Sequence, residues 1–248
     1  EWLYLIDTFT LFATLGALIR LPRLPVLDAV KGAPGFTAVI DGFIYLRTQP
    51  VLLMSFVVDL IAMVFGMPRA LFPEIAHVDF GGPENGGLVF ALLFAAIPAG
   101  AVIGGVFSGW VSRVERQGVA VVVCIAVWGV SMAGFGFAVA LADQWRTPMV
   151  VVALVMLVVG GASDMASAAF RMSMLQSAAD DALRGRLQGV FIVVVAGGPR
   201  IADTVHGVSA AAVGTAAAAA GGGVLVVIGV VVASLAVPSF VRYRITRS

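Results

Sequence analysis

The sequence predicts an all-α, polytopic membrane protein in which one helix precedes a bundle of six helices, arranged as two three-helix repeats. Hydrophobic residues make up 60% of the 248 residues and charged residues 12%, whereas a soluble domain carries about 25% charged residues. Mean hydropathy is +1.05, and several apolar stretches are long enough to cross a bilayer. The composition therefore excludes an ordinary soluble domain.

The expected spans are runs of about 18 or more predominantly apolar residues, the length that a helix needs to cross the hydrocarbon core. They cover residues 2–19, 51–73, 87–111, 119–141, 149–175, 187–213 and 217–237. We expect residues 1–19 to form a separate helix, residues 51–241 to form the six-helix bundle, and residues 242–248 to form a tail.

Residues 20–50 form the one long polar connection, and the stretch GFTAVIDGFIYLRTQ within it is amphipathic. We expect that stretch to be a helix lying along the membrane surface. Arginine and lysine collect in this linker, in the turns after spans 87–111 and 149–175, and in the tail, whereas the opposite loops hold only Arg146 and, at a span end, Arg69. The linker and the C-terminus are therefore expected to face the cytoplasm.

The two ends and the overall charge add further expectations. The chain begins at Glu1 without the basic start or the small-residue cleavage site of a signal peptide, so we expect a piece of a longer protein. The net charge of +1 provides no basic face for phosphates, so nucleic acid is not an expected partner. A single cysteine, Cys124, excludes a disulfide framework and a multi-cysteine metal site.

Two spans combine helix-breaking residues with charges in their interiors. These residues are Asp59, Gly66-Met67-Pro68 and Arg69 in span 51–73, and Gly160-Gly161, Asp164 and Arg171 in span 149–175. The two spans are the first helices of the two repeats, and broken helices at matching places indicate a transporter's binding site. The third helices of the repeats, 119–141 and 217–237, carry no charge and are expected to face lipid as outer supports.

Span 187–213 contains the run Gly197-Gly198-Pro199-Arg200-Ile201-Ala202-Asp203, which predicts another broken helix with its own charges. Ionisable groups at bilayer depth cost several kcal/mol, so they persist where they face protein or a water-filled cavity. The charged spans therefore predict a polar path through the membrane. In span 87–111, the spacings Gly100 to Gly104 and Gly105 to Gly109 predict close helix contacts.

Two groups of three helices with a cytoplasmic linker before them resemble one half of a major facilitator superfamily transporter. The loop Gly109-Trp-Val-Ser-Arg113-Val-Glu-Arg116-Gln-Gly118 is similar to a loop motif of that superfamily, with Arg113 in place of the motif's aspartate. Four further strings resemble its enterobactin-exporter-like branch: VVDLIAMVFGMPRALFPEIA, GASDMASAAFRMSMLQ, LRGRLQGVFIVVVAGGPRIAD and VPSFVRYR.

This resemblance implies a proton-driven exporter of a siderophore or another hydrophobic small molecule in the bacterial cytoplasmic membrane. It implies that residues 1–19 are the last helix of an N-terminal half, that the rest is the C-terminal half, and that the lipid bilayer, protons and the missing half are its partners. Two alternatives stay open, namely multidrug efflux with broad lipophilic cargo and a non-transporting scaffold or half-transporter.

Asp164 is the first candidate for the proton-coupling residue, because a carboxylate shielded from water can bind and release a proton near neutral pH. The alternative is a fixed ion pair with Arg171, seven residues later and so on the same helix face. Asp203 and Asp59 are the other candidates. Asp203 is expected to pair with Arg200, three residues before it, or to release Arg200 for an anionic cargo when protonated.

The remaining candidates line the expected cavity or close its ends. Methionine and aromatic side chains suit an apolar cargo, and His206 extends the helix face of Asp203, although a lone histidine is more often a hydrogen-bonded bystander. The cavity candidates are Arg200, Arg171, His206, Met67, Met165 and Phe170. The gate candidates are Arg69, Glu74, Arg113 and Arg116. Arg69 and Glu74 flank Pro73, where they are expected to pair as an outer gate or as an ordinary interfacial pair.

Other classes of membrane protein are not supported. The sequence has no Gly-x-Ser-x-Gly nucleophile elbow and no His-Glu-x-x-His metal helix, and its two histidines, His77 and His206, lie far apart. No catalytic residue, metal site or cofactor is therefore expected, and the protein is not expected to be an enzyme. An ion channel is not supported either, because no acidic ring or carbonyl-filter string occurs.

Overall fold

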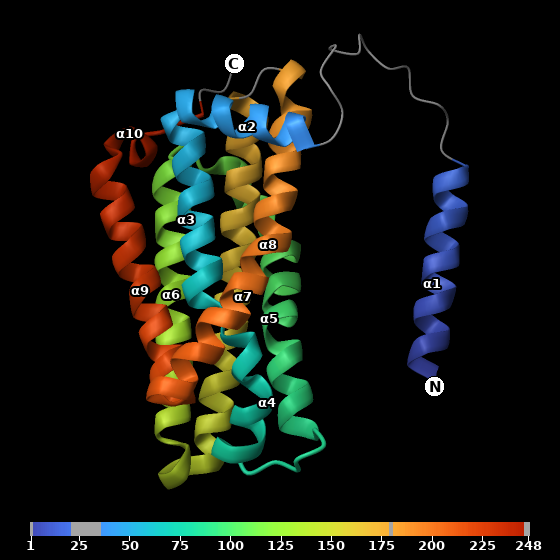
Figure 1. Ribbon diagram of the computed structural model, residues 1–248, viewed down its shortest axis with the longest axis vertical. Coiled ribbons are helices and arrows are strands. Elements are labelled where there is room, and N and C mark those ends of the chain that lie inside the picture. The colour runs from blue at the N-terminus through green and yellow to red at the C-terminus, as the bar shows by residue number, and fades with distance from the viewer. Residues whose placement is uncertain (1, 21–35, 179–180, 246–248) are drawn as a thin grey trace. The chain divides into compact units, whose positions relative to one another are not determined.

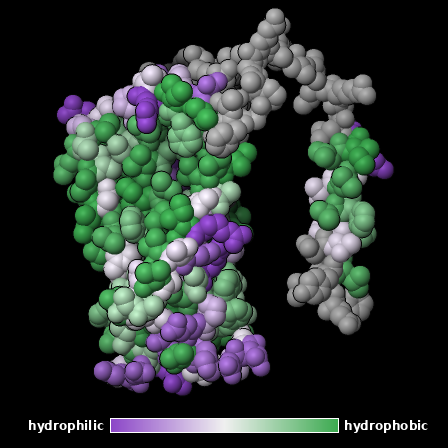
Figure 2. Space-filling view, in the orientation of Figure 1, coloured by the Kyte–Doolittle hydropathy of each residue, from purple (hydrophilic) through white to green (hydrophobic). Residues whose placement is uncertain are grey.

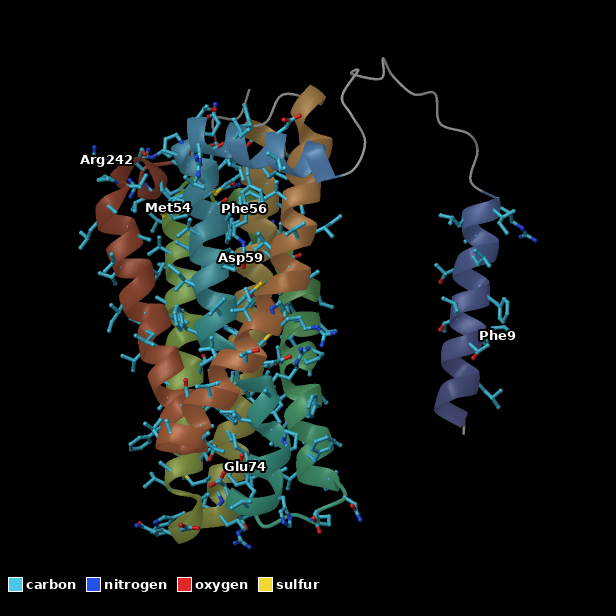
Figure 3. The ribbon with its side chains drawn as sticks, viewed as in Figure 1. Phe9, Met54, Phe56, Asp59, Glu74 and Arg242 are labelled. Atoms are coloured by element: carbon cyan, nitrogen blue, oxygen red, sulfur yellow. The ribbon has the colours of Figure 1, made fainter. Side chains whose placement is uncertain are left out.

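The computed structural model describes residues 2–20, 36–178 and 181–245, and the ordered elements among them are helical, with no strand. The chain divides into two compact units, Glu1–Ala33 and Pro34–Ser248. In the first unit α1 spans Trp2–Ile19, the predicted range, and Figure 3 shows its exposed Phe9. Linker residues 21–35, including Arg23 and Lys31, lie outside the described residues.

The second unit is a bundle of long helices with a short helix across one end (Figure 1). Its α-helices are α2 (Phe36–Thr48), α3 (Pro50–Gly66), α4 (Phe72–Glu74), α5 (Leu88–Val106), α6 (Gln117–Ala140), α7 (Ala142–Ala178), α8 (Asp181–Val213), α9 (Thr215–Ala236) and α10 (Pro238–Val241). Among the described residues six helices are long and apolar enough to cross a membrane, and they coincide with the six spans expected after residue 50. In the first unit, Thr8–Ile19 is the apolar part of α1 among the described residues.

Helix α2 forms where the amphipathic stretch predicts a helix, and it lies across the end of the bundle that also carries α10, here called the α2 end (Figure 1). A small apolar cluster joins it to the long helices. The fully buried Leu46 of α2 packs there with Leu52 of α3 and Leu187 of α8. This packing attaches α2 to the first turns of α3 and α8.

The hydrophobic core is built around α6, which was expected to face lipid. Trp128, Met132 and Phe135 of this helix are at most 2% exposed, because α6 packs between α7 and α9. The prediction holds for one face only, since Val123, Val130 and Phe137 of α6 are 54%, 60% and 64% exposed. The absence of charge does not distinguish a lipid-facing from a core face, because lipid tails and protein cores are equally apolar. Helix α9 is intermediate, with Val226 buried and Ile228 exposed.

The outer surface of the second unit is apolar along most of its length. Figure 2 shows a broad hydrophobic band with hydrophilic residues at both ends and one hydrophilic patch partway along the band. This distribution is typical of a protein whose middle lies in hydrocarbon and whose ends lie in water.

Helices α5 and α7 approach each other at backbone distance. A Cβ atom on Gly100 would collide with the Val158 carbonyl, and one on Gly161 would collide with the Ile97 carbonyl. Gly104 approaches Ala162 in the same way. The predicted contact through Gly100 and Gly104 is confirmed.

The second small-residue spacing in α5 is different. Gly109 has no atom within 4 Å of the position its Cβ would take, and Gly105 has only the flexible Met165 side chain at 3.7 Å. The contact predicted through Gly105 and Gly109 is therefore wrong.

The break predicted at Gly66-Met67-Pro68 is confirmed. Helix α3 ends at Gly66, Met67 leaves the helical region with φ −117° and ψ 81°, and the chain continues through a 3-10 turn η1 (Pro68–Leu71), α4 and a π-helical turn η2 (Ile75–Asp79). Pro68 has no N–H for the carbonyl four residues earlier, so the helix cannot continue unchanged through it.

The other two predicted breaks are wrong. Helix α7 continues through Gly160-Gly161, and its non-helical residue is Trp145 instead. Helix α8 continues through the whole run from Gly197 to Asp203, and Figure 1 shows it changing direction partway along. In hydrocarbon an unwound segment leaves backbone groups without partners, so a helix persists through glycine and proline unless neighbours supply those partners.

Candidate functional site

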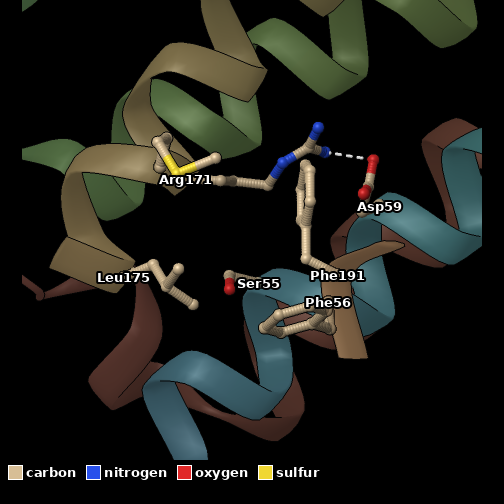
Figure 4. Close-up of a pocket in the computed structure, with 7 residues that line it drawn as sticks. Ser55, Phe56, Asp59, Arg171, Leu175 and Phe191 are labelled. Carbon is tan, nitrogen blue, oxygen red and sulfur yellow. Dashed lines mark ion pairs between the residues drawn. The ribbon is translucent and has the colours of Figure 1, made fainter. Parts of the chain in front are cut away.

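A buried ion pair joins α3 to α7 in the half of the bundle nearer the α2 end. Asp59 Oδ1 lies 2.5 Å from Arg171 Nη1, and the two side chains are 2% and 6% exposed (Figure 4). Figure 3 shows Asp59 beyond Met54 and Phe56 along α3. A pair buried this deeply is held by its geometry, since either partner alone would be an uncompensated charge.

Arg171 pairs with Asp59 and not with Asp164, so the ion pair expected between the two residues of α7 is not formed. Asp164 is half-buried, has no hydrogen bond or ion pair to any described residue, and lies beside Met63, Met67 and Trp128. It still acts electrostatically on both partners of the pair.

Asp59, Arg171 and Asp164, here called the buried triad, thus place one arginine between two acids. They bring together two proton candidates and one cavity candidate, with Met67 beside Asp164.

A small cavity of about 10 Å³ adjoins the ion pair, with room for about one water molecule. Ser55 and Leu175 line it together with Phe56 and Phe191, whose rings pack edge to face with centroids 6.4 Å apart (Figure 4). Phe56 belongs to the apolar cluster that holds α2. The two rings therefore lie in the apolar layer between the buried pair and the α2 end.

A second ion pair joins η1, just after the break in α3, to α8. Arg69 Nη2 donates to Asp203 Oδ2 at 3.1 Å. Two predicted pairings are therefore wrong, namely Arg200 with Asp203 and Arg69 with Glu74. Arg200 and Glu74 are both exposed. Sequence proximity favoured these local pairs, but the break in α3 turns Arg69 towards α8.

His206 is 2% exposed and lies one turn beyond Asp203 on α8. Its ring approaches the Phe65 carbonyl within hydrogen-bonding range, and its Nε2 has no hydrogen-bond partner among the described residues. Phe65 belongs to the last turn of α3, whose carbonyls lose their helical partners at the break. His206 thus supplies a partner where the backbone needs one, and with Ser209 it lines a cavity of about 230 Å³ between α8 and α9.

The remaining candidates lie apart from these groups. Phe170 is fully buried and packs edge to face on Trp110, with centroids 5.4 Å apart, so it is a core residue. Met165 is 39% exposed and lies near Gly105. Arg113 and Arg116 are exposed near the end of α5 and the start of α6, and the described part of the chain pairs neither with an acid.

Several residues that line the site were not expected from the sequence, among them Ser55 and Trp128. Ser55 lies one turn before Asp59, a spacing that places it on the same helix face, so this signal was present. Trp128 of α6 donates its indole N–H to the Ala62 carbonyl at 3.2 Å and lies beside Asp164. No sequence signal marks Trp128, because its contact with α3 is 66 residues distant. Among the described residues no His, Cys, Asp and Glu cluster could hold a metal ion.

Comparison with known proteins gives a consistent set of relatives. A sequence profile of the family described as transmembrane secretion effector matches residues 1–243. The enterobactin exporter EntS of Salmonella typhi is 26% identical over 190 residues, which cover 77% of this chain and 42% of the relative. EntS of Shigella boydii serotype 18 is 27% identical over 191 residues, with the same shares. The chain therefore spans about two fifths of the length of these relatives. No solved structure is significantly similar to it.

Proposed function

The chain belongs to the transmembrane secretion effector family of the major facilitator superfamily, and we propose that it forms the C-terminal half of a proton-coupled exporter of a siderophore or another hydrophobic small molecule. Its curated relatives are exporters that are about 26% identical, and six of its helices can cross a membrane. The observation that carries the proposal is the buried triad of Asp59, Arg171 and Asp164.

The charge of the triad makes it responsive to protons. With both acids ionised and Arg171 protonated, the group has a net charge of −1 among apolar helices, which is costly. Uptake of one proton by either acid makes the group neutral. The proton therefore has two possible positions, and the arginine can pair with the acid that remains ionised.

These two positions correspond to two partners for Arg171, one on α3 and one on its own helix α7. When Asp164 holds the proton, Arg171 pairs with Asp59, as in the described structure. When Asp59 holds it, Arg171 is free to pair with Asp164 on its own helix, and the bond between the helices is lost. A transporter needs such a two-state element, which the proton biases one way and the cargo the other.

The rest of the cavity and its orientation are part of the proposal. Because the chain spans 42% of its relatives, we propose that an N-terminal half supplies the opposite wall and that the two halves rock about a midplane site. Exposed arginines at the α2 end, such as Arg113, Arg116 and Arg242, support a cytoplasmic position for that end and for the C-terminus.

The proposed cargo contacts lie at the charged patch of α8. Figure 2 shows a hydrophilic patch partway along the apolar band, on the face of the bundle where Figure 1 places α8. Arg200 of α8 is exposed and unpaired within the described residues, and Arg69 is 43% exposed. The two arginines provide polar anchors on an otherwise apolar wall, and Met67 beside the triad provides an adaptable apolar contact.

Uptake into inside-out vesicles that contain the full-length protein tests the proposal, because an exporter in this orientation moves its cargo into the vesicle lumen. Enterobactin and a lipophilic cationic dye are compared under an imposed pH gradient. We expect gradient-driven movement of at least one compound, and its loss in Asp164→Asn, because an amide cannot carry the proton. Asp143→Asn removes an exposed carboxylate and is the matched control, which should behave like the wild type.

Each result of this experiment has a definite meaning. Selective movement of enterobactin supports siderophore export, and movement of both compounds supports multidrug efflux. Normal gradient-driven movement by Asp164→Asn would remove the triad from the mechanism. Failure of the wild type to take up either compound would favour a non-transporting membrane scaffold.

A further inference from the structure

Helix α8 holds the break in α3 from both sides. His206 approaches the Phe65 carbonyl, which precedes the break, and Asp203 binds Arg69, which follows it. The two α8 residues are three positions apart, so they are neighbours on one helix face. Together, Arg69, Asp203, His206 and the Phe65 carbonyl are here called the α8 clamp.

The α8 clamp contains two buried polar atoms without hydrogen bonds to any described residue. Asp203 has Oδ2 bound to Arg69, and its Oδ1 has no partner. His206 is 2% exposed, and its Nε2 has no partner. Buried polar atoms are nearly always paired, so two unpaired atoms one turn apart require an explanation.

The count of donors and acceptors supplies that explanation. A neutral imidazole has one N–H donor, whereas an imidazolium has two. The ring of His206 faces one acceptor, the Phe65 carbonyl, and a second acceptor, the Asp203 carboxylate one turn earlier on α8, acts on the ring electrostatically. A neutral imidazole ring can donate to only one of these two acceptors, so the α8 clamp has one N–H donor too few.

We propose that Asp203 and His206 form a second proton-binding site, separate from the buried triad. One proton from the aqueous phase binds the free ring nitrogen of His206, a new N–H bond forms, and no bond to carbon changes. The imidazolium then donates to both the Phe65 carbonyl and Asp203. The proton site does not depend on transport, whereas its coupling to movement of α3 rests on the proposed function.

Loading this site changes how the break in α3 is held. Asp203 is then shared by two cations, Arg69 through Oδ2 and the imidazolium through Oδ1. Its attraction for Arg69 is divided, so η1 is released more easily from α8, while His206 holds the end of α3 more firmly. The proton thus stiffens one side of the break and loosens the other.

Few other charged groups act on the site. Arg69 of η1 contacts Asp203. Arg200 lies one turn before Asp203 on α8, and its side chain is exposed. Helix α9, which packs against the ring through Gly222, has no titratable side chain between Thr215 and Ala236. Among the described residues, Asp203 is therefore the anion that acts on His206.

Histidine-specific ¹⁵N NMR of the full-length protein in lipid nanodiscs tests the proposal without cargo or a gradient. The His206 signals are assigned by their loss in His206→Gln. We expect them to change from the neutral to the imidazolium pattern between about pH 8 and pH 5, the range in which histidine titrates. In Asp203→Asn the ring should stay neutral over this range, because its counter-anion is gone. Asp143→Asn, which removes an exposed carboxylate elsewhere, should titrate like the wild type.

The wild-type titration is decisive even if Asp203→Asn folds poorly. A wild-type ring that stays neutral down to about pH 5 overturns the proposal, and a water molecule between His206 Nε2 and Asp203 Oδ1 would then explain the two atoms without partners. A ring that titrates equally in Asp203→Asn also overturns it. Because no transport is measured, these outcomes are independent of whether Asp164→Asn abolishes efflux.

Discussion

Arg171 of α7 pairs with Asp59 of α3 and leaves Asp164, on its own helix, without an ion pair. Arg171 therefore connects α7 to α3, whereas a pair with Asp164 would have stayed within α7. A bond between helices responds to their relative movement, whereas a bond within one helix does not. This choice of partner makes the buried triad suitable for coupling and leads to the first two predictions.

A double-mutant cycle on the ion pair should show strong coupling. Arg171→Leu leaves Asp59 buried without a cation and should lower the free energy of unfolding by about 3–5 kcal/mol. Asp59→Leu combined with Arg171→Leu removes both charges and should recover most of that loss. Thermal unfolding of the full-length protein in detergent measures the two single variants, Arg171→Leu and Asp59→Leu, and the double variant. Losses that simply add in the double variant would contradict a direct pairing.

Asp164→Asn should separate proton coupling from cargo movement. The amide cannot bind the proton but leaves the Asp59–Arg171 pair in place, so the protein should fold. We expect gradient-driven efflux to stop while exchange of labelled for unlabelled cargo, at equal pH on both sides, continues. Loss of exchange as well would indicate that Asp164 supports the structure or contacts the cargo.

Phe191 should limit access to the cavity beside the ion pair. Ser55→Cys, in a background lacking Cys124, places a thiol in that cavity, where Ser55 is 3% exposed. A small thiol reagent should modify it slowly. Phe191→Ala removes the ring that packs on Phe56 and should accelerate modification severalfold.

The matched control for this experiment is Ile192→Ala, because Ile192 is the next residue and 59% exposed. It should leave the rate of modification unchanged. Equal acceleration by both variants would mean that α8 as a whole had loosened, and that Phe191 does not close the cavity.

Gly100→Ala should weaken the contact between α5 and α7. Its Cβ would collide with the Val158 carbonyl, which cannot move without displacing α7. Overpacking of this kind costs about 1–3 kcal/mol. Gly221→Ala of α9 is the control, since no atom lies within 4 Å of its Cβ position. Thermal unfolding compares them, and equal stability of the two variants would contradict the close contact.

The sequence predicts the helices well because hydropathy depends on local composition. The thickness of the hydrocarbon core sets the length of a membrane-spanning helix, so the six spans after residue 50 appear where expected. The break at Met67-Pro68 was also predictable, but breaks at Gly160 and Pro199 were wrong. The break in α3 differs from the other two because side chains from other helices, His206 and Trp128, reach carbonyls near the end of α3. Partners so distant in the sequence leave no local signal.

The site was predicted in its members but not in its pairings. Asp59, Asp164 and Arg171 were all recognised, because ionisable residues in apolar spans are rare. Their partners were assigned by spacing along one helix, which favoured Arg171 with Asp164 and Arg200 with Asp203. The structure pairs residues across helices instead, over 112 positions for Asp59 with Arg171 and 134 for Arg69 with Asp203. Side-chain spacing describes a helix surface, but it does not reveal which helix lies opposite.

The backbone contact between α5 and α7 has a consequence for how the protein can change over time. Where Gly100 and Gly161 meet the facing carbonyls, no side chain sets the distance between the two helices. Mutations can then replace residues that line the pockets beside α3 and α8, while α5 and α7 keep their spacing. The lining of these pockets can therefore diverge while the spacing of α5 and α7 stays the same, provided that Gly100 and Gly161 themselves remain without side chains.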